Sequence, residues 1–360
     1  MSAAGAFERV PGRRRERGVA LIIALILVAL AAILATKLTF DGWIERRRTI
    51  GIMATEQAFH FGMGAEALAA DVLNQSMQGV QVGANGQAST NGTTGGTATT
   101  QSGSPNQVTL AQAWAQPTQP MPITPDDNPE GEPIGVLQGA IEDMQGRFNL
   151  NNLAHMIMQN GQAIQDPQPL QQFQRLLVSV GLEPKWAGIA RDWIDADDQP
   201  GEPDGAEDSV YTSQTPPYRT GNWPMMSPSE LMNMPGFGAD RYRKIAPYVT
   251  ALPTATAKIN ICTAPAQVLQ SFAENLSSDY TPELLASERK SGCFPDKQTF
   301  ANVLGPTVAA AMASQYSDTS LYFRLTTRVT LGTTEFTLYS LLYRTPGGKV
   351  TPLLRTFGTL

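Results

Sequence analysis

RRRERG at residues 13–18, followed by VALIIALILVALAAILAT at residues 19–36, is the stretch around which this chain is organised. The basic segment ends at Gly18, and the 18 residues after Gly18 carry no charge before Lys37. At about 1.5 Å rise per residue, a helix of this length just crosses a hydrocarbon core of about 30 Å. No small-residue cleavage motif of a secretory signal follows the apolar run. The sequence therefore predicts one membrane helix that stays on the mature protein.

This N-terminus resembles the type IV prepilin class, whose short basic leaders end in Gly and are cut there by a prepilin peptidase. The resemblance implies a cleaved leader at residues 1–18 and a mature chain that starts, methylated, at Val19. Most pilins carry Glu at the fifth mature position, where this chain has Ile23. Among pseudopilins, that absence is similar to the K-type minor pseudopilin of type II secretion, the large subunit at the pseudopilus tip. A plain signal anchor is the alternative for the N-terminal stretch alone.

The charge pattern bears on orientation and on partners. Basic residues before the helix favour a cytoplasmic N-terminus, which the family resemblance also implies, whereas Arg46, Arg47 and Arg48 on the far side oppose it. Asp41 and Glu45 count little in this rule. The whole chain has a net charge of -6, and the leader contributes five Arg and two Glu, so the mature chain is near -9. This balance argues against non-specific nucleic-acid binding, which needs clustered Lys and Arg.

The pattern of the remaining chain predicts an α+β protein. We expect a spine helix over residues 19–79, with its transmembrane half at 19–39, because no proline interrupts the helical spacing up to Leu73. Residues 80–125, rich in Gly, Thr, Ser, Asn and Gln before a proline-rich stretch, predict a flexible loop. Residues 126–150 and 320–360 alternate like strands, and Gly332 marks a hairpin turn between two of them.

These strands bracket residues 151–319, which read mainly as helices, with cap-and-proline starts such as Ser227-Pro-Ser-Glu230. A long N-terminal helix packed on an antiparallel sheet, with a large inserted helical domain, is what K-type pseudopilins look like. The marks of the resemblance include GRFNLNNL at 146–153 and INICTAP at 259–265.

The densest charge cluster predicts a calcium site. Seven carboxylates lie between Asp195 and Asp208 with no Lys or Arg among them, so they repel one another unless a cation neutralises them. Ca²⁺ takes about six to eight oxygen ligands, although the spacing is not that of an EF-hand. The resemblance to the calcium region of K-type pseudopilins implies one or two ions. The expected ligands are Asp195, Asp197, Glu207 and Asp208, with Asp198 and Asp204 as further candidates. A solvated acidic loop is the alternative.

The chain contains two cysteines, Cys262 and Cys293. In an oxidising periplasm the pair is most simply one disulfide. It would close a loop of about thirty residues and stabilise the fold by about 3 kcal/mol in the chain-entropy model. Two buried free thiols are the alternative.

Residues 234–245, MPGFGADRYRKI, resemble the hairpin of helix-hairpin-helix modules, in which a glycine-rich turn donates main-chain N–H groups to a DNA phosphate. Arg241, Arg243 and Lys244 suit such a contact, although the same turn serves plain helix packing in SAM-like domains. The alternative function is therefore a membrane-anchored periplasmic DNA-binding protein of the competence type.

No enzymatic motif is found. The chain has only His60 and His155, and it lacks the nucleophile-elbow, zinc-protease, P-loop and dinucleotide-binding patterns. The resemblance implies a non-enzymatic minor pseudopilin that caps the periplasmic pseudopilus and supports secretion of folded proteins. It implies I-, J- and H-type minor pseudopilins, a prepilin peptidase and the inner membrane as partners, with no nucleic acid and no small-molecule substrate.

Overall fold

The computed structural model describes residues 17–77, 81–82, 88–89, 107–125, 128, 130–274, 276 and 279–357. Residues 1–16 of the predicted leader and half of the predicted flexible loop lie outside these residues. The chain divides into two units, Met1–Gln57 and Ala58–Leu360, and each is described by itself.

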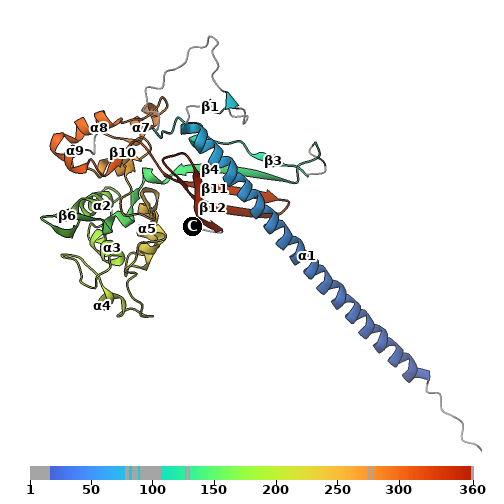
Figure 1. Cartoon of the computed structure of the whole chain (residues 1–360). Helices are drawn as coiled ribbons and strands as arrows, with labels where there is room; N and C mark the ends of the chain where they lie inside the picture. Colours follow the sequence, from blue (N-terminus) through green and yellow to red (C-terminus); the bar gives the residue numbers. More distant parts are fainter. Residues whose placement is uncertain are drawn as a thin grey trace, which may run out of the picture. The chain divides into compact units, whose positions relative to one another are not determined.

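Helix α1, Arg17–Met77, begins in the first unit and ends in the second (Figure 1). From Val19 to Trp43 every side chain of the helix is exposed. The helix is long and apolar enough to cross a membrane by length and composition. Apolar surface of this extent is stable only when lipid or another chain covers it, which is consistent with a single membrane anchor.

The second unit contains a five-stranded antiparallel sheet in the order β13-β12-β11-β4-β3. Its strands are β3 (Met121–Ile123), β4 (Gly135–Asp143), β11 (Tyr322–Leu331), β12 (Thr334–Arg344) and β13 (Val350–Phe357). The β11–β12 hairpin turns at Gly332, whose φ of 56° is easily reached without a side chain. Because β11 also pairs along its length with β4, the two ends of the inserted segment start from neighbouring strands.

The last turns of α1 pack on this sheet. Small residues on the helix, such as Ala58 and Ala69, are buried among side chains of β11 and β12. A Cβ at Gly62 would meet Leu338 at 3.0 Å, so glycine permits the close approach. Glu66 is buried and forms an ion pair with Arg355 of β13 at 2.7 Å. The predicted packing of the spine helix on an antiparallel sheet is thereby confirmed.

The segment between β4 and β11 forms the mainly helical insert (Figure 1). Its helices are α2 (Pro167–Ser179), α3 (Trp186–Ile194), α4 (Asp208–Tyr211), α5 (Gly238–Ile245), α6 (Ala266–Gln270), α7 (Pro282–Glu288), α8 (Lys297–Leu304) and α9 (Pro306–Met312). Short strand pairs join them: β5 (Phe148–Asn149) with β8 (Val249–Thr250), β6 (Met156–Gln159) with β7 (Gln162–Gln165), and β9 (Ile259–Asn260) with β10 (Tyr316–Ser317). One core, which includes Phe148 stacked on Phe173, holds the insert together.

A buried polar network joins the insert to the sheet. Asp143, at the end of β4, accepts hydrogen bonds from Asn260, Thr263 and Ser320 at 2.9, 2.7 and 2.6 Å. The main-chain N–H of Gln145 donates to the other carboxylate oxygen at 2.9 Å. Arg344, also buried, donates to the carbonyl oxygens of Leu73 and Ser320, each at 3.3 Å. One charged cluster therefore connects α1, the sheet and the insert.

The structure pairs Cys262 with Cys293 in a disulfide, which confirms the predicted bond. Between the two cysteines, the buried Arg289 donates to the carbonyl oxygens of Ile261 and Phe294 at 2.8 and 2.7 Å. The disulfide and this guanidinium hold the start of α6 and the end of α7 together.

Three features differ from the sequence-based expectations. The expected flexible loop over 80–125 ends earlier, because the buried Trp114 packs on Phe323 and residues Met121–Ile123 form the edge strand β3. The helix expected from Ser227 is the 3-10 helix Pro228–Asn233, although its capping box is present. Helices α8 and α9 lie within the segment expected to be mainly helical, but neither was predicted as a separate helix. Each of these is short, so local periodicity is weak and long-range packing decides the conformation.

Candidate metal centre

The acidic loop lies between two helices that position its ends. Asp195 is the C-cap of α3, and Glu207 is the N-cap of α4. The main-chain N–H of Gly205 donates to the carbonyl oxygen of Gly201 at 2.6 Å, so the loop folds back on itself. A carboxylate from each end is thus brought to the same place.

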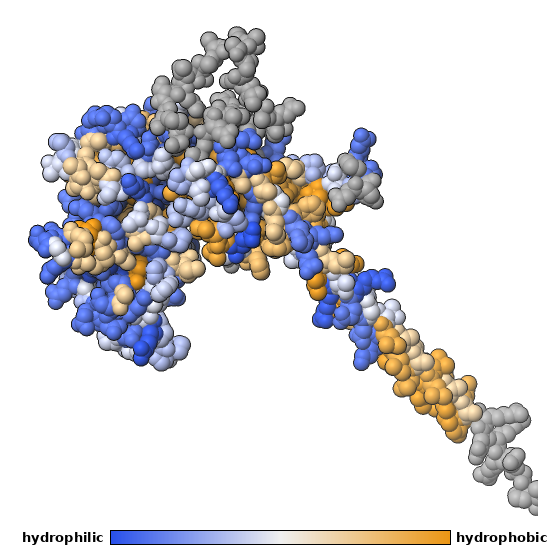
Figure 2. Space-filling model, viewed as in Figure 1, coloured by the Kyte–Doolittle hydropathy of each residue, from blue (hydrophilic) through white to orange (hydrophobic). Residues whose placement is uncertain are grey.

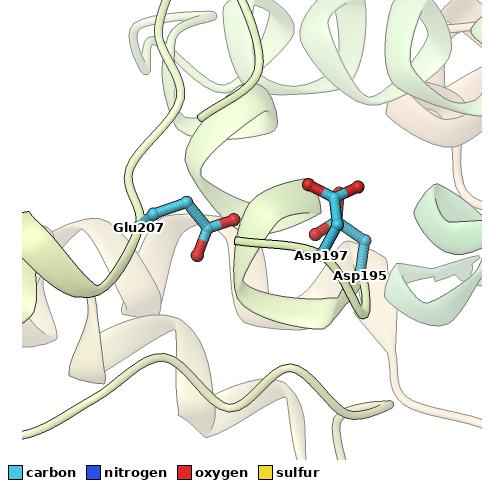
Figure 3. A group of neighbouring side chains, drawn as sticks. All are labelled: Asp195, Asp197 and Glu207. Atoms are coloured by element: carbon cyan, nitrogen blue, oxygen red, sulfur yellow. The ribbon is translucent and has the colours of Figure 1, made fainter. Parts of the chain in front are cut away.

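Asp195, Asp197 and Glu207 each offer one carboxylate oxygen, and these oxygens lie within 4.8 Å of one another. Figure 3 shows the Glu207 carboxylate facing those of the two aspartates. Calcium binds oxygens at about 2.3–2.6 Å, so this separation fits three ligands around one ion. Both carboxylate oxygens of Glu207 and Oδ1 of Asp195 are buried and without a hydrogen-bond partner. Buried carboxylate oxygens without donors are costly unless a cation satisfies them.

The electrostatics of Asp195 and Glu207 agree with this geometry. The pKa of Glu207 is raised to about 7, first by burial and then by the negative charges of the neighbouring Asp192, Asp195, Asp197 and Asp198. Burial also raises the pKa of Asp195 to about 6, and Gln165, which donates to it at 2.9 Å, opposes the rise. Without a cation, the folded chain therefore disfavours the ionised form of both groups.

The other three predicted ligands lie outside this triad. Asp198 accepts a hydrogen bond from the side chain of Asn222 at 3.2 Å. Asp208 accepts from the main chain and hydroxyl of Thr220, both at 3.1 Å, and its other oxygen lies 3.5 Å from Arg219. Asp204 is exposed. The structure thus brings three of the six predicted carboxylates together.

Asp192 is a residue of the site that the predicted ligand set omits. It is fully buried, and its Oδ2 accepts from the main-chain N–H groups of Gly201 and Ala206, each at 2.9 Å. A Cβ at Gly205 would lie 2.3 Å from the same oxygen, so only glycine fits there. Asp192 therefore shapes the loop. Asp192 precedes Asp195 by three residues, which places both on one helical face. This spacing is the sequence signal that could have included Asp192 in the site.

The glycine-rich turn before α5 is held by its own side chains. Arg241 donates to the carbonyl oxygens of Gly236 and Phe237 at 2.8 and 3.2 Å, and its guanidinium lies 5.4 Å from the Trp186 ring centroid. Phe237 is buried against the same ring. Arg241, one of the residues expected to suit a phosphate, therefore serves helix packing.

The predicted processing and assembly residues all lie on α1. Gly18 is the second residue of the helix, and Val19 follows it with an exposed side chain. Ile23 is exposed as well.

Comparisons with known proteins agree on one family. The model of the family described as "Type II secretion system (T2SS), protein K" matches residues 146–254. Type II secretion system protein K of Pseudomonas aeruginosa is 30% identical over 350 residues, covering 96% of this chain and 94% of the relative. The protein of the same name from Klebsiella pneumoniae is 35% identical over 253 residues, 69% of this chain and 67% of that one.

A solved structure shares the fold. It is described as the crystal structure of the GspK-GspI-GspJ complex of enterotoxigenic Escherichia coli, and the matching chain is 24% identical with a TM-score of 0.67. The match covers 87% of this chain and all of the other. The apolar spine helix, the antiparallel sheet with its helical insert, and these relatives lead to one conclusion: the chain belongs to the type II secretion system protein K family of minor pseudopilins, which are structural subunits and not enzymes.

Proposed function

We propose that this chain caps the periplasmic tip of the pseudopilus and so supports the secretion of folded proteins. The observation that carries the proposal is the apolar half of α1, exposed from Val19 to Thr36 and without any carboxylate. In the pilin class, a Glu at the position of Ile23 is thought to neutralise the N-terminal amine of the neighbouring subunit during assembly. A subunit without that group has no such contact to make, as expected of one with nothing above it.

The partners that we propose are the I- and J-type minor pseudopilins, with the H-type subunit as the next in the filament. The solved structure that shares this fold was determined as a complex with GspI and GspJ, which supports the first two. The exposed apolar residues of α1 suit packing against the α1 helices of such partners once the subunit leaves the lipid. A periplasmic head and a cytoplasmic N-terminus complete the proposed topology in the inner membrane.

Deleting the protein tests the capping role. In a host that assembles visible pseudopili, the deletion should change pseudopilus length or number and impair secretion, and the wild-type chain should restore both. If the missing carboxylate only reflects the tip position, Ile23→Glu should restore secretion nearly as well as the wild type. Unchanged pseudopili together with normal secretion in the deletion strain would show that the subunit is no cap.

Replacing Gly18 by valine should block maturation by the prepilin peptidase. The pilin-type leader is cut after glycine, and a β-branched side chain should not be accepted at that position. Mass spectrometry of membrane-extracted protein should find Val19 at the N-terminus of the wild type and Met1 at that of the variant. Gly42→Val, which lies in the same helix beyond the cleavage position, is the matched control. A wild-type chain that keeps residues 1–18 in cells with an active peptidase contradicts the pilin-type processing.

We further propose that calcium occupies the triad of Asp195, Asp197 and Glu207, and that a second ion could use other carboxylates of the loop, such as Asp198, Asp204 and Asp208. The convergence of three carboxylates, two of them with buried oxygens that lack donors, supports the first ion. The ion would tie the end of α3 to the start of α4. Its role is structural, and its removal is considered in the Discussion.

A further inference from the structure

The part of α1 directly after the apolar run forms a basic and aromatic collar, which we define as Lys37–Arg48. It contains the basic residues Lys37, Arg46, Arg47 and Arg48 and the aromatic residues Phe40 and Trp43. Figure 2 shows the orange apolar length of the helix giving way to a blue band. We propose that this collar binds the anionic headgroups of phospholipids in the far leaflet of the membrane, an inference that rests on the proposed single-pass anchor.

The collar lies at the depth of the headgroups. At about 1.5 Å per residue, Trp43 is about 36 Å along the helix from Val19, and Arg46 is about 40 Å from it. A hydrocarbon core of about 30 Å within a bilayer of about 40–45 Å places both residues in or beside the far headgroup layer. Phe40 and Trp43 are 58% and 54% exposed, as aromatic residues that anchor a helix at this interface must be.

Side-chain geometry brings the arginines back toward the bilayer. Helical side chains lean toward the N-terminus of their helix, which for α1 is the membrane side. The guanidinium of Arg47 lies 4.9 Å from the centroid of the Trp43 ring, one turn nearer the apolar run. The Trp43 ring is also stacked with Phe40 at 6.3 Å between centroids. Arg47 therefore presents its charge at the depth of the aromatic pair.

Most of the positive charge of the collar is not neutralised by an ion pair. Arg48 lies 3.4 Å from Glu45, and both side chains are largely exposed. Within the described part of the chain, Lys37, Arg46 and Arg47 form no ion pair. Four basic residues against Asp41 and Glu45 leave a net charge of +2 in the collar, in a chain whose total is -6. Phosphate groups supply the bidentate acceptors that guanidinium prefers.

The distribution around the helix favours lipid over an acidic partner helix. At about 100° per residue, the two aromatic residues and all four basic residues share an arc of about 200° around the helix. The remaining arc carries Leu38, Asp41, Gly42, Glu45 and Thr49. Membrane helices approach each other through small residues such as Gly42. A partner helix against Gly42 leaves Arg47 and Arg48, about 140° and about 120° away around the helix, facing lipid. This also gives a reason for basic residues on the side of the membrane that the positive-inside rule disfavours.

The test measures which lipid surrounds Trp43. Full-length protein is reconstituted in phosphatidylcholine vesicles that contain phosphatidylglycerol, and either lipid is brominated in turn to quench tryptophan fluorescence. Because the chain has five tryptophans, the signal of the matching Trp43→Phe protein is subtracted. Each basic residue near an anionic surface is worth about fivefold in affinity, so the wild type should prefer phosphatidylglycerol by at least about fivefold. High salt should reduce this preference, because it screens exposed charges.

Substitutions separate charge from other effects. Arg46→Gln, Arg47→Gln and Arg48→Gln together should bring the preference close to one, whereas the three lysine substitutions should retain most of it. The matched control carries Arg243→Gln, Lys244→Gln and Lys290→Gln, which remove the same charge from exposed positions in the second unit and should change nothing.

Two results overturn the collar proposal: equal quenching by both brominated lipids in the wild type, or a preference that the glutamine substitutions leave intact. If these substitutions instead release co-purified I- and J-type partners while the lipid preference stays, the arginines contact acidic partner residues. Leader cleavage at Val19 and partner binding, measured on the same preparations, report on the proposed function separately. Intact leader cleavage and partner binding without a lipid preference would contradict the collar proposal and leave the proposed function standing.

Discussion

Replacing Asp143 by alanine should lower the free energy of unfolding of the second unit by about 3–5 kcal/mol. The substitution removes the acceptor of four hydrogen bonds, including those from Asn260 and Thr263 of the insert. Each donor would lose the carboxylate that it faces, although Asn260 keeps its hydrogen bonds to Val108 and Ser320. The buried Arg344 would also lose the negative charge of Asp143, which favours its ionised form. Burial raises the pKa of Asp143, and these donors oppose that shift. Denaturant unfolding of the full chain in detergent, followed by near-ultraviolet circular dichroism, measures the change.

Two further variants make the Asp143 result specific. Asp143→Asn keeps the shape and one acceptor oxygen, so its loss of stability should be smaller than that of alanine. Asp240→Ala removes a carboxylate that is 90% exposed, and should cost less than about 0.5 kcal/mol. If the free energy of unfolding of Asp143→Ala lies within about 1 kcal/mol of the wild-type value, the bridging role of this network is contradicted.

Removing calcium should lower the melting temperature of the full chain and open the acidic loop. Ligand linkage adds about 2.7 kcal/mol of stability when free calcium is about 100 times its Kd. Without the ion, the carboxylates of Asp195, Asp197 and Glu207 face one another, and their repulsion favours an open loop. Differential scanning calorimetry with calcium and with chelator gives the stability change, and limited proteolysis should cut faster near Gly201 and Gly205 under chelation.

Variants of the loop identify the ligands. Asp195→Asn and Glu207→Gln should each abolish the response of the melting temperature to calcium. Glu202→Gln makes the same charge change at an exposed position of the same loop and should leave the response intact. Magnesium should replace calcium poorly, because it requires a tighter octahedral shell and keeps its waters. Identical melting curves with calcium and with chelator, in protein shown to be metal-free, would reduce the loop to a solvated acidic surface.

The raised pKa values of the triad predict a pH dependence with a definite sign. In the metal-free protein, the folded pKa values of Glu207 and Asp195, about 7 and about 6, lie above their ordinary values. The folded state then binds more protons than the unfolded state, so these groups stabilise at low pH and lose that contribution as the pH rises through about 6–7. Protons compete with the ion, so the stabilisation by calcium should grow over the same interval. Calorimetry at pH 5, 6 and 7.5 measures both trends.

The sequence by itself determined the elements whose information is local. The apolar run after Gly18 has the length and composition of a membrane helix, and its extent needs no tertiary contact to be recognised. The β11–β12 hairpin alternates apolar and polar residues around Gly332, so its register follows from the turn. With only Cys262 and Cys293 in the chain, a single disulfide could have only one pairing.

Only the tertiary structure decided which distant residues meet. Seven carboxylates crowd the acidic loop, and the chain between α3 and α4 brings Asp195, Asp197 and Glu207 together, while Asp192 turns inward to bind the loop's main chain. Asp143 carries no sequence mark of its role, since its donors lie more than one hundred residues away, apart from the nearby Gln145. Local propensity spans only about 1 kcal/mol per residue, so burial and long-range hydrogen bonds, which depend on the whole fold, fix such sites.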